Sequence, residues 1–234
     1  AAAGVASPRL DAALLLGHVL DVPRHVLALG GGRHVPDAAA ARFEELVAQR
    51  ERRRPVSHLL GRAEFWSLEL EVTDDTLAPR PETELLVEEA ARFLRPRAAA
   101  LAADVGTGTG CITAALLVEC PRLRMHAVDV SPAALAVARR NLVRHGVADR
   151  AVLHEGDLLA PLAASAAPLT FDAVVSNPPY VAHHERADVD PEVLWEPAHA
   201  VFCDGEPREV YAAVARCAAP LVRAGGLLLL ELPG

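Results

Sequence analysis

The sequence contains no lysine, and its 23 basic residues other than histidine are all arginine. A lysine amine forms the Schiff base of pyridoxal-phosphate and related enzymes, and it contacts the phosphates in a P-loop. These classes of enzyme are therefore excluded. The net charge of −8 also argues against general binding to a nucleic-acid backbone, which relies on basic side chains that neutralise phosphates.

Cysteine is scarce and scattered. No C-x-x-C pair occurs among the four cysteines, which are Cys111, Cys120, Cys203 and Cys217. This pattern fits neither a zinc site nor a disulfide framework, whereas free thiols are typical of a reducing cytosol. We therefore predict a cytoplasmic protein that holds no metal. The one candidate ligand group, His183-His184-Glu185, is better explained as a solvated loop.

Long apolar runs are also missing. No stretch of about 18 uncharged apolar residues is present, so no membrane span is expected. Arg9 and Asp11 interrupt the first apolar stretch, which argues against a signal peptide. Aromatic residues make up only 4% of the 234 residues, but apolar residues make up 52%. A chain of this length and composition can form a main domain with its own core and a second, smaller domain.

Helical patterns dominate residues 1–62, for which we predict a small helical domain. Ser7-Pro8 is a typical helix start, and apolar residues then recur at helical spacing as far as Leu20. Three glycines at 30–32 interrupt the pattern, and a second helix is predicted over residues 37–53. Near the end of this helix stand four arginines, Arg50, Arg52, Arg53 and Arg54. They could form a local basic patch, but the solvated end of a helix is the simpler explanation.

Residues 63–84 change character and predict a hairpin and a linker. From Trp66 to Val72 apolar and polar residues alternate, which is the pattern of a half-buried strand. The residues 73–75, Thr-Asp-Asp, favour a turn. Pro79 and Pro81 then stiffen a loop that leads into a helix over residues 85–94.

From residue 100 onward, short apolar runs alternate with helical stretches. The runs cover residues 101–105, 124–130, 151–154, 171–176 and 227–232. This alternation is typical of βαβ units, so residues 85–234 predict an α/β fold with a mostly parallel, Rossmann-like sheet. Ligands on such sheets bind at the carboxyl ends of the strands, and the functional motifs are expected there.

A glycine-rich motif follows the first of these strands. In Asp104-Val105-Gly106-Thr107-Gly108-Thr109-Gly110 the glycines permit a sharp turn and the close approach of a ligand. Asp129 ends the second strand, where a carboxylate can accept hydrogen bonds from a ribose diol, and Asp157 follows the third, where it can meet an adenine edge. Each signal alone is also explained by a tight turn, a helix cap or a turn former. Together they predict a nucleoside cofactor, with NAD as the competing ligand.

The motif Asn177-Pro178-Pro179-Tyr180 follows the fourth apolar run and is the most specific signal in the chain. Its prolines fix the turn and remove N–H donors, which leaves carbonyl acceptors. The Asn177 side-chain oxygen and the Pro178 carbonyl can accept both hydrogens of a planar –NH2 group, while Tyr180 stacks on its face. Such a clamp orients the nitrogen lone pair toward an electrophilic methyl group. We predict methyl transfer to an amide or amino nitrogen, and a structural proline turn is the alternative.

These two motifs together resemble class I methyltransferases that act on amide or exocyclic nitrogens. The segments Phe65-Trp66-Ser67-Leu68 and Pro79-Arg80-Pro81-Glu82-Thr83-Glu84 more narrowly resemble the release-factor protein-(glutamine-N5) methyltransferase family (HemK/PrmC), from about Leu10 to Glu231. The resemblance implies an enzyme that uses S-adenosyl-L-methionine to methylate the glutamine of the GGQ motif in peptide-chain release factors, and so modulates translation termination. It also implies that the helical N-terminal domain docks the release factor.

The resemblance further implies a role for each motif residue. The methionine part of the cofactor would lie against Gly106, Thr107, Gly108, Thr109 and Gly110. The ribose would contact Asp129, the adenine would contact Asp157 and Leu158, and Asn177 would border both ligands. The glutamine amide would be held by Asn177, Pro178, Pro179 and Tyr180, of which Asn177, Pro178 and Tyr180 would be catalytic.

Two features depart from that family. Leu158 stands where some relatives place an aromatic residue, so weaker stacking on adenine is expected. The chain also stops just after the fifth predicted strand, at Leu232-Pro233-Gly234. Sheets of this class usually continue with a helix and two more strands, so the carboxyl-terminal strands of the catalytic domain are expected to be missing from this sequence.

Three alternatives stay open. A methyltransferase that acts on a glutamine of a ribosomal protein would share the Asn-Pro-Pro-Tyr signature. A DNA or RNA amino methyltransferase would flip a base into a similar pocket, although the net charge of −8 counts against it. A cofactor-binding regulator without catalysis would not need Asn177. A monomer is predicted, with neither a membrane nor a nucleic acid as a direct partner.

Overall fold

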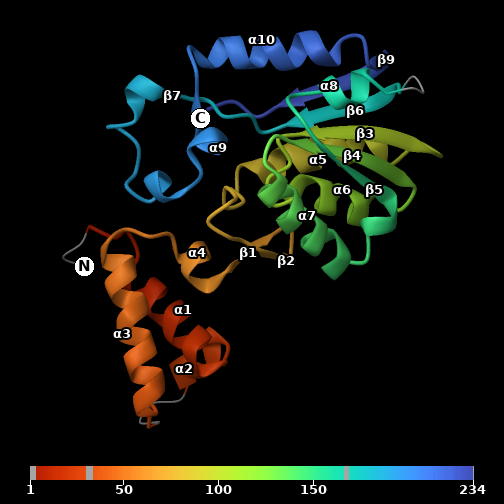
Figure 1. Cartoon of the computed structure of the whole chain (residues 1–234). Helices are drawn as coiled ribbons and strands as arrows, with labels where there is room; N and C mark the ends of the chain where they lie inside the picture. The colour runs from red at the N-terminus through yellow and green to blue at the C-terminus, as the bar shows by residue number, and fades with distance from the viewer. Residues whose placement is uncertain (1–3, 30–33, 166–168, 234) are drawn as a thin grey trace.

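The computed structural model describes residues 4–29, 34–165 and 169–233. A helical amino-terminal part is joined through a hairpin to a larger part built on a parallel sheet (Figure 1). The predicted glycine break at residues 30–32 lies outside the described residues. None of the helices in these ranges combines the length and the apolar composition that a membrane span requires.

Four helices form the amino-terminal part. They are α1 (Pro8–Leu20), α2 (Arg24–Leu29), α3 (Asp37–Glu51) and α4 (Val56–Leu60). Both helices predicted from the sequence are present, whereas the short α2 and α4 were not predicted. Ser7 stands at the start of α1 without a side-chain capping bond, and Pro8 occupies the first turn. A small core of Leu15, Leu46 and Leu59 holds α1, α3 and α4 together.

The hairpin consists of β1 (Arg62–Phe65) and β2 (Leu68–Glu71), which pair antiparallel. The prediction of a strand beginning at Trp66 is wrong, because Trp66 and Ser67 form the turn with φ angles of 54° and 59°. Two-residue turns with both φ positive match the twist of the flanking strands. The Trp66 backbone N–H donates to Glu84 Oε1 at 2.7 Å, and its indole N–H donates to Glu119 Oε1 at 2.8 Å. These bonds offset the cost of left-handed backbone in a bulky residue.

All five predicted strands of the large sheet are present and parallel, in the order β5-β4-β3-β6-β9. They are β3 (Ala100–Val105), β4 (Leu123–Asp129), β5 (Ala151–Glu155), β6 (Phe171–Ser176) and β9 (Val222–Leu230). Their carboxyl ends therefore meet at one edge of the sheet. The predicted α/β, Rossmann-like fold class is confirmed, and β9 begins five residues before the apolar run that indicated it.

Helices cover both faces of the sheet (Figure 1). One face packs against α5 (Thr83–Leu94), α6 (Cys111–Glu119) and α7 (Pro132–Arg144), and the hairpin joins the same core. The other face packs against α8 (Ala160–Ala163) and α10 (Pro207–Ala218). Between β6 and α10 the chain forms a small parallel pair, β7 (Val181–Ala182) and β8 (Phe202–Cys203), and the short helix α9 (Ala198–Val201).

Of the four arginines at the end of α3, Arg50, Arg53 and Arg54 bind carboxylates, whereas Arg52 is exposed as expected for a solvated helix end. Arg50 contacts Glu192 Oε1 at 2.9 Å and Asp11 Oδ2 at 2.8 Å. The Arg53 side chain, which is only 20% exposed, also pairs with Glu192. Glu192 belongs to the segment that follows Tyr180, so these ion pairs tie the helical part to the chain beyond the predicted catalytic motif.

Asn141 joins three parts of the molecule. It lies on α7 and is fully buried. Its Oδ1 accepts from the Glu71 N–H at 2.7 Å, and its Nδ2 donates to the Glu71 carbonyl at 3.0 Å and to the Thr109 carbonyl at 2.9 Å. One amide therefore ties the hairpin to the glycine loop.

We predict that Asn141→Leu lowers the free energy of unfolding by about 3 kcal/mol, because three backbone groups lose their partner at a buried position. Urea denaturation measures this change. Arg139→Ala, at an exposed position on the same helix, is the control and is expected to stay close to wild type. An unchanged denaturation midpoint for Asn141→Leu would contradict the prediction.

His126 and His154 form a stacked pair on β4 and β5. Their ring centroids are 5.0 Å apart, and Nδ1 of His126 lies 2.9 Å from Nε2 of His154. Such a bond needs one N–H and one lone pair, so double protonation breaks it. Burial lowers the pKa of both rings below the usual 6.5, and the charge on His154 further lowers the pKa of His126.

A depressed histidine pKa makes the unfolded chain bind protons more readily than the folded one, so folding stability falls as the pH drops below about 6.5. We predict that the melting temperature of His154→Gln depends less steeply on pH than that of wild type between pH 7.5 and 5.5. His34→Gln, at an exposed position, is the matched control and keeps the wild-type slope. Equal slopes in wild type and His154→Gln would refute the assignment.

Candidate active site at the carboxyl edge of the sheet

The glycine loop opens onto a cavity of about 250 Å³ at the end of β3. Gly106 and Gly108 line it, with φ angles of 72° and 53° that favour glycine. A Cβ added to either residue would meet no atom within 4 Å, so both face open space. The backbone N–H groups of Gly106 and Thr107 donate to the Val128 carbonyl at 2.9 and 3.0 Å, which anchors the loop to β4.

The other predicted loop residues lie beneath the cavity. Thr107, Thr109 and Gly110 are buried and are not among the residues that line it. The Thr107 hydroxyl donates to Asp104 Oδ2 at 2.7 Å, and the Thr113 hydroxyl donates to the same oxygen at 2.7 Å. Burial raises the pKa of Asp104 to about 6. Asp104, to which the sequence analysis gave no role, thus braces the loop from below.

Asp129 connects the ends of two strands. Its Oδ2 accepts from the Gly108 N–H at 2.8 Å, and its Oδ1 accepts from the Ser131 N–H at 2.9 Å. The cap of α7 is Ser131, whose hydroxyl oxygen accepts from the Ala134 N–H at 3.2 Å. The helix-cap explanation therefore does not apply to Asp129. Asp129 lines the cavity, and each of its oxygens keeps a lone pair for a ligand.

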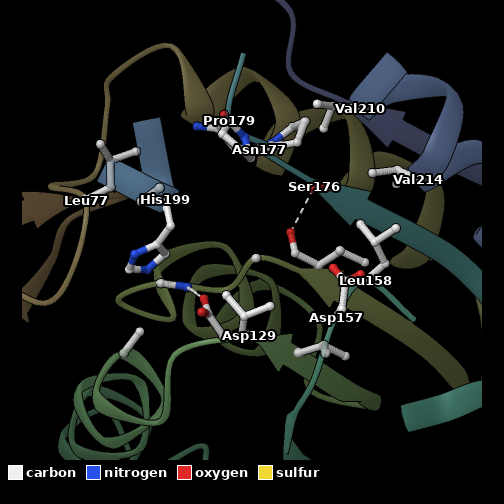
Figure 2. A pocket seen from close by; sticks show the side chains of 18 of the residues that line it. Leu77, Asp129, Asp157, Leu158, Ser176, Asn177, Pro179, His199, Val210 and Val214 are labelled. Carbon is white, nitrogen blue, oxygen red and sulfur yellow. Dashed lines mark hydrogen bonds between the residues drawn. The ribbon is translucent and has the colours of Figure 1, made fainter. Parts of the chain in front are cut away.

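Figure 2 shows Asp129, Asp157 and Leu158 across the cavity from Asn177 and Pro179. Asp157 follows the end of β5 and is exposed. Leu158 is half-buried, and its φ of 48° marks a tight turn after the strand. The polar residues predicted from three different strand ends thus line a single cavity.

The motif Asn177-Pro178-Pro179-Tyr180 follows β6 beside the glycine loop. Ser176, the last residue of β6, donates its hydroxyl to the Val105 carbonyl at 2.7 Å (Figure 2). The Asn177 Nδ2 donates to Thr83 Oγ1 at 3.1 Å. Because Thr83 is the first residue of α5, this bond fixes the Asn177 side chain against a second element.

A second cavity, of about 470 Å³, also borders this motif. It is lined by Tyr180, Arg80 and Glu192, among others. The two cavities share Leu77, Asn177, Pro178, Pro179 and Ala200. The motif therefore borders both the cavity at the glycine loop and a second cavity whose lining includes Glu192, the partner of Arg50 and Arg53.

Two features of the site were not predicted. Glu196 is buried, and its Oε1 accepts from the Ala78 N–H at 3.1 Å while its Oε2 pairs with Arg80. Burial raises the pKa of this carboxyl. The pair holds the loop over residues 77–80, of which Leu77 and Arg80 line the second cavity.

His199 lines the first cavity from α9 (Figure 2). Neither residue belongs to a recognisable local pattern, so no sequence signal points to them.

The fold and this site define a methyltransferase with a Rossmann-like, class I sheet. A family model described as the methyltransferase small domain matches residues 81–219, and a model described as the PrmC N-terminal domain matches residues 1–61. Among solved structures, the hMettl16 catalytic domain in complex with the MAT2A 3'UTR hairpin 1 has a TM-score of 0.55 at 16% identity. That alignment covers 80% of this chain and 65% of the other, and it shows the likeness of fold alone.

Relatives define the family more closely. The release factor glutamine methyltransferase of Cereibacter sphaeroides is 45% identical over 99% of this chain and 81% of the relative. The protein of the same name from Mycolicibacterium smegmatis is 43% identical over 99% of this chain and 79% of the relative. The chain belongs to the release factor glutamine methyltransferase family.

We predict that Gly106→Ala weakens the binding of S-adenosylhomocysteine by about tenfold or more, because the added methyl group enters the cavity. Isothermal titration calorimetry measures this affinity. The matched control is Gly146→Ala, because Gly146 has a φ of 68° and its added Cβ likewise meets no atom within 4 Å. Both variants carry the same backbone strain, of about 1 kcal/mol. Equal affinity in the two variants would place the cofactor elsewhere.

Proposed function

We propose that this chain transfers a methyl group from S-adenosyl-L-methionine to the side-chain N5 nitrogen of the glutamine in the GGQ motif of peptide-chain release factors. The observation that carries the proposal is the position of Asn177, Pro178 and Pro179 between two cavities. A donor in one and an acceptor in the other would meet at this motif. The name shared by the relatives supports the release-factor glutamine as the acceptor.

The first cavity suits the donor. Gly106 and Gly108 leave open space where any other residue would place a side chain. The Asp129 carboxylate would accept hydrogen bonds from the ribose hydroxyls, and Asp157 with Leu158 would border the adenine. When bound, this cofactor supplies a methyl group made electrophilic by its sulfonium.

The second cavity suits the acceptor amide. The Asn177 side-chain oxygen and the Pro178 carbonyl would each accept one hydrogen of the –NH2 group, while the Tyr180 ring packs against its flat face. An amide nitrogen is a weak nucleophile because its lone pair is delocalised. Orientation of that lone pair toward the methyl group can lower the barrier by ~7–11 kcal/mol. The nitrogen would gain the methyl group as the S–CH3 bond breaks, with S-adenosyl-L-homocysteine as the leaving group, and would release one proton to water.

The proposal also assigns a role to each part of the chain. Residues 1–62 would dock the release factor, residues 63–84 would form the hairpin and linker, and residues 85–234 would carry catalysis. Separate cores of the helical part and the sheet support this division. Release factors act where proteins are synthesised, so we place the protein in the cytoplasm. We propose a monomer that contacts no nucleic acid directly, in keeping with the net charge of −8.

The proposal is tested by transfer of a radiolabelled methyl group to a purified release factor. The same release factor with the GGQ glutamine replaced by alanine is the control. Label on the unmodified factor alone is the expected result. Equal label on both factors would contradict the assignment of the glutamine, and label only on ribosomal protein or nucleic acid would contradict the release factor as the substrate.

We predict that Asn177→Ala reduces kcat/KM for methyl transfer by about 100- to 1000-fold, because one of the two acceptors for the amide hydrogens is lost. The Kd for S-adenosylhomocysteine is expected to stay near the wild-type value, since the Gly106 and Asp129 contacts remain. Steady-state kinetics and calorimetry measure the two quantities. A comparable loss of both would show that Asn177 acts on the structure and not on the acceptor.

A further inference from the structure

The proposed role of Asn177 depends on which way its amide points. Only the orientation with Oδ1 toward the second cavity offers an acceptor to the –NH2 group of a substrate. The one hydrogen bond of this side chain within the described residues is that from Nδ2 to Thr83 Oγ1, at 3.1 Å. A threonine hydroxyl can donate as well as accept. Thr83 alone would therefore tolerate either orientation of the amide.

Glu231 supplies the missing constraint. It follows β9, and its N–H donates to the Ser176 carbonyl at 3.0 Å, which places it beside Asn177. Its Oε2 is buried and has no hydrogen-bond partner among the residues described. Thr83 is itself buried, with 1% of its surface exposed. The Thr83 hydroxyl and the Asn177 amide are both near enough to the Glu231 carboxyl to lower its pKa.

We propose that Glu231 and Thr83 are positioning residues that fix the orientation of the Asn177 amide for the acceptor nitrogen. An ionised carboxylate can only accept hydrogen bonds, so it takes the hydroxyl hydrogen of Thr83. The Thr83 oxygen must then accept from Asn177 Nδ2, and Asn177 Oδ1 is left free for the substrate. This inference rests on the proposed function, because it concerns the same amide clamp.

The ionised form of Glu231 is the one that orders this chain of bonds. Burial raises the pKa of the Glu231 carboxyl, while the neighbouring Thr83 hydroxyl and Asn177 amide lower this pKa. Methyl transfer is expected to decline as the pH falls through this raised pKa, because a protonated carboxyl can also donate to Thr83. The neighbouring charged and titratable groups are Arg80, Glu82, Tyr180 and Tyr211.

The first test replaces Glu231 by glutamine, whose amide can present either a donor or an acceptor to Thr83. We expect kcat to fall about tenfold or more, while KM for S-adenosylmethionine and Kd for S-adenosylhomocysteine stay within twofold. The decline of kcat toward low pH that depends on Glu231 is also expected to disappear in this variant. Glu88→Gln, at an exposed position on α5, is the matched control and keeps wild-type kinetics.

Variants at Thr83 separate the hydroxyl from the shape of the side chain. Thr83→Val keeps the shape, removes the hydroxyl and is expected to behave like Glu231→Gln. Thr83→Ser keeps the hydroxyl and is expected to retain most of the activity. Wild-type kcat and pH profile in Glu231→Gln, or wild-type kcat in Thr83→Val, would overturn the proposal.

A measurement independent of activity is possible because Asn141 and Asn177 are the only asparagines in the chain. Selective 15N-asparagine labelling gives two side-chain amide signals, and the buried Asn141 serves as an internal reference. We expect the Asn177 signal to titrate with pH in wild type and to lose that titration in Glu231→Gln, while the Asn141 signal stays the same. An Asn177 signal that responds to pH in the same way in wild type and in Glu231→Gln would overturn the inference. Failure to label a release factor would instead count against the proposed function alone.

Discussion

The Ser176 hydroxyl donates to the Val105 carbonyl at 2.7 Å and joins the last residues of β6 and β3. Val105 and Ser176 are also register partners in the parallel sheet. The glycine loop and the Asn177 turn therefore leave the sheet at the same level, side by side. A shift of one residue between the two strands would turn the side chains of one of them to the opposite face and separate the two motifs. The relation between the two cavities depends on this register.

Buried polar groups hold the loops at this edge of the sheet rigidly in place. Asp104 braces the glycine loop through Thr107, Asp129 binds the loop backbone at Gly108, and Asn141 holds the Thr109 carbonyl. On the other side of the site, Thr83 holds the Asn177 amide. Each of these contacts crosses between elements, so the loops at the carboxyl edge are fixed by the helices and strands behind them. Methyl transfer that relies on orientation requires such rigidity.

Much of the fold and of the site could be predicted from local sequence patterns. Apolar runs located all five parallel strands, and glycine, aspartate and the Asn177 motif marked the strand ends that line the cavities. Contacts of long range were not predictable. The turn at Trp66 depends on Glu84 and Glu119, and the loop at Ala78 depends on Glu196, 118 residues away. Single carboxylates such as Glu196 and Glu231 have no neighbours in the sequence that reveal what they will contact once the chain folds.

The proposed reaction requires that Asn177 and Pro178 hold the acceptor amide where the two cavities meet, with its nitrogen toward the donor. The most direct measurement is a crystal structure of this chain with S-adenosylhomocysteine and a peptide that carries the Gly-Gly-Gln sequence. We expect the sulfur in the cavity beside Gly106 and Gly108, and the glutamine amide within hydrogen-bond distance of Asn177 Oδ1 and the Pro178 carbonyl. A glutamine amide bound away from these two oxygens, with the sulfur in its predicted place, would contradict this requirement.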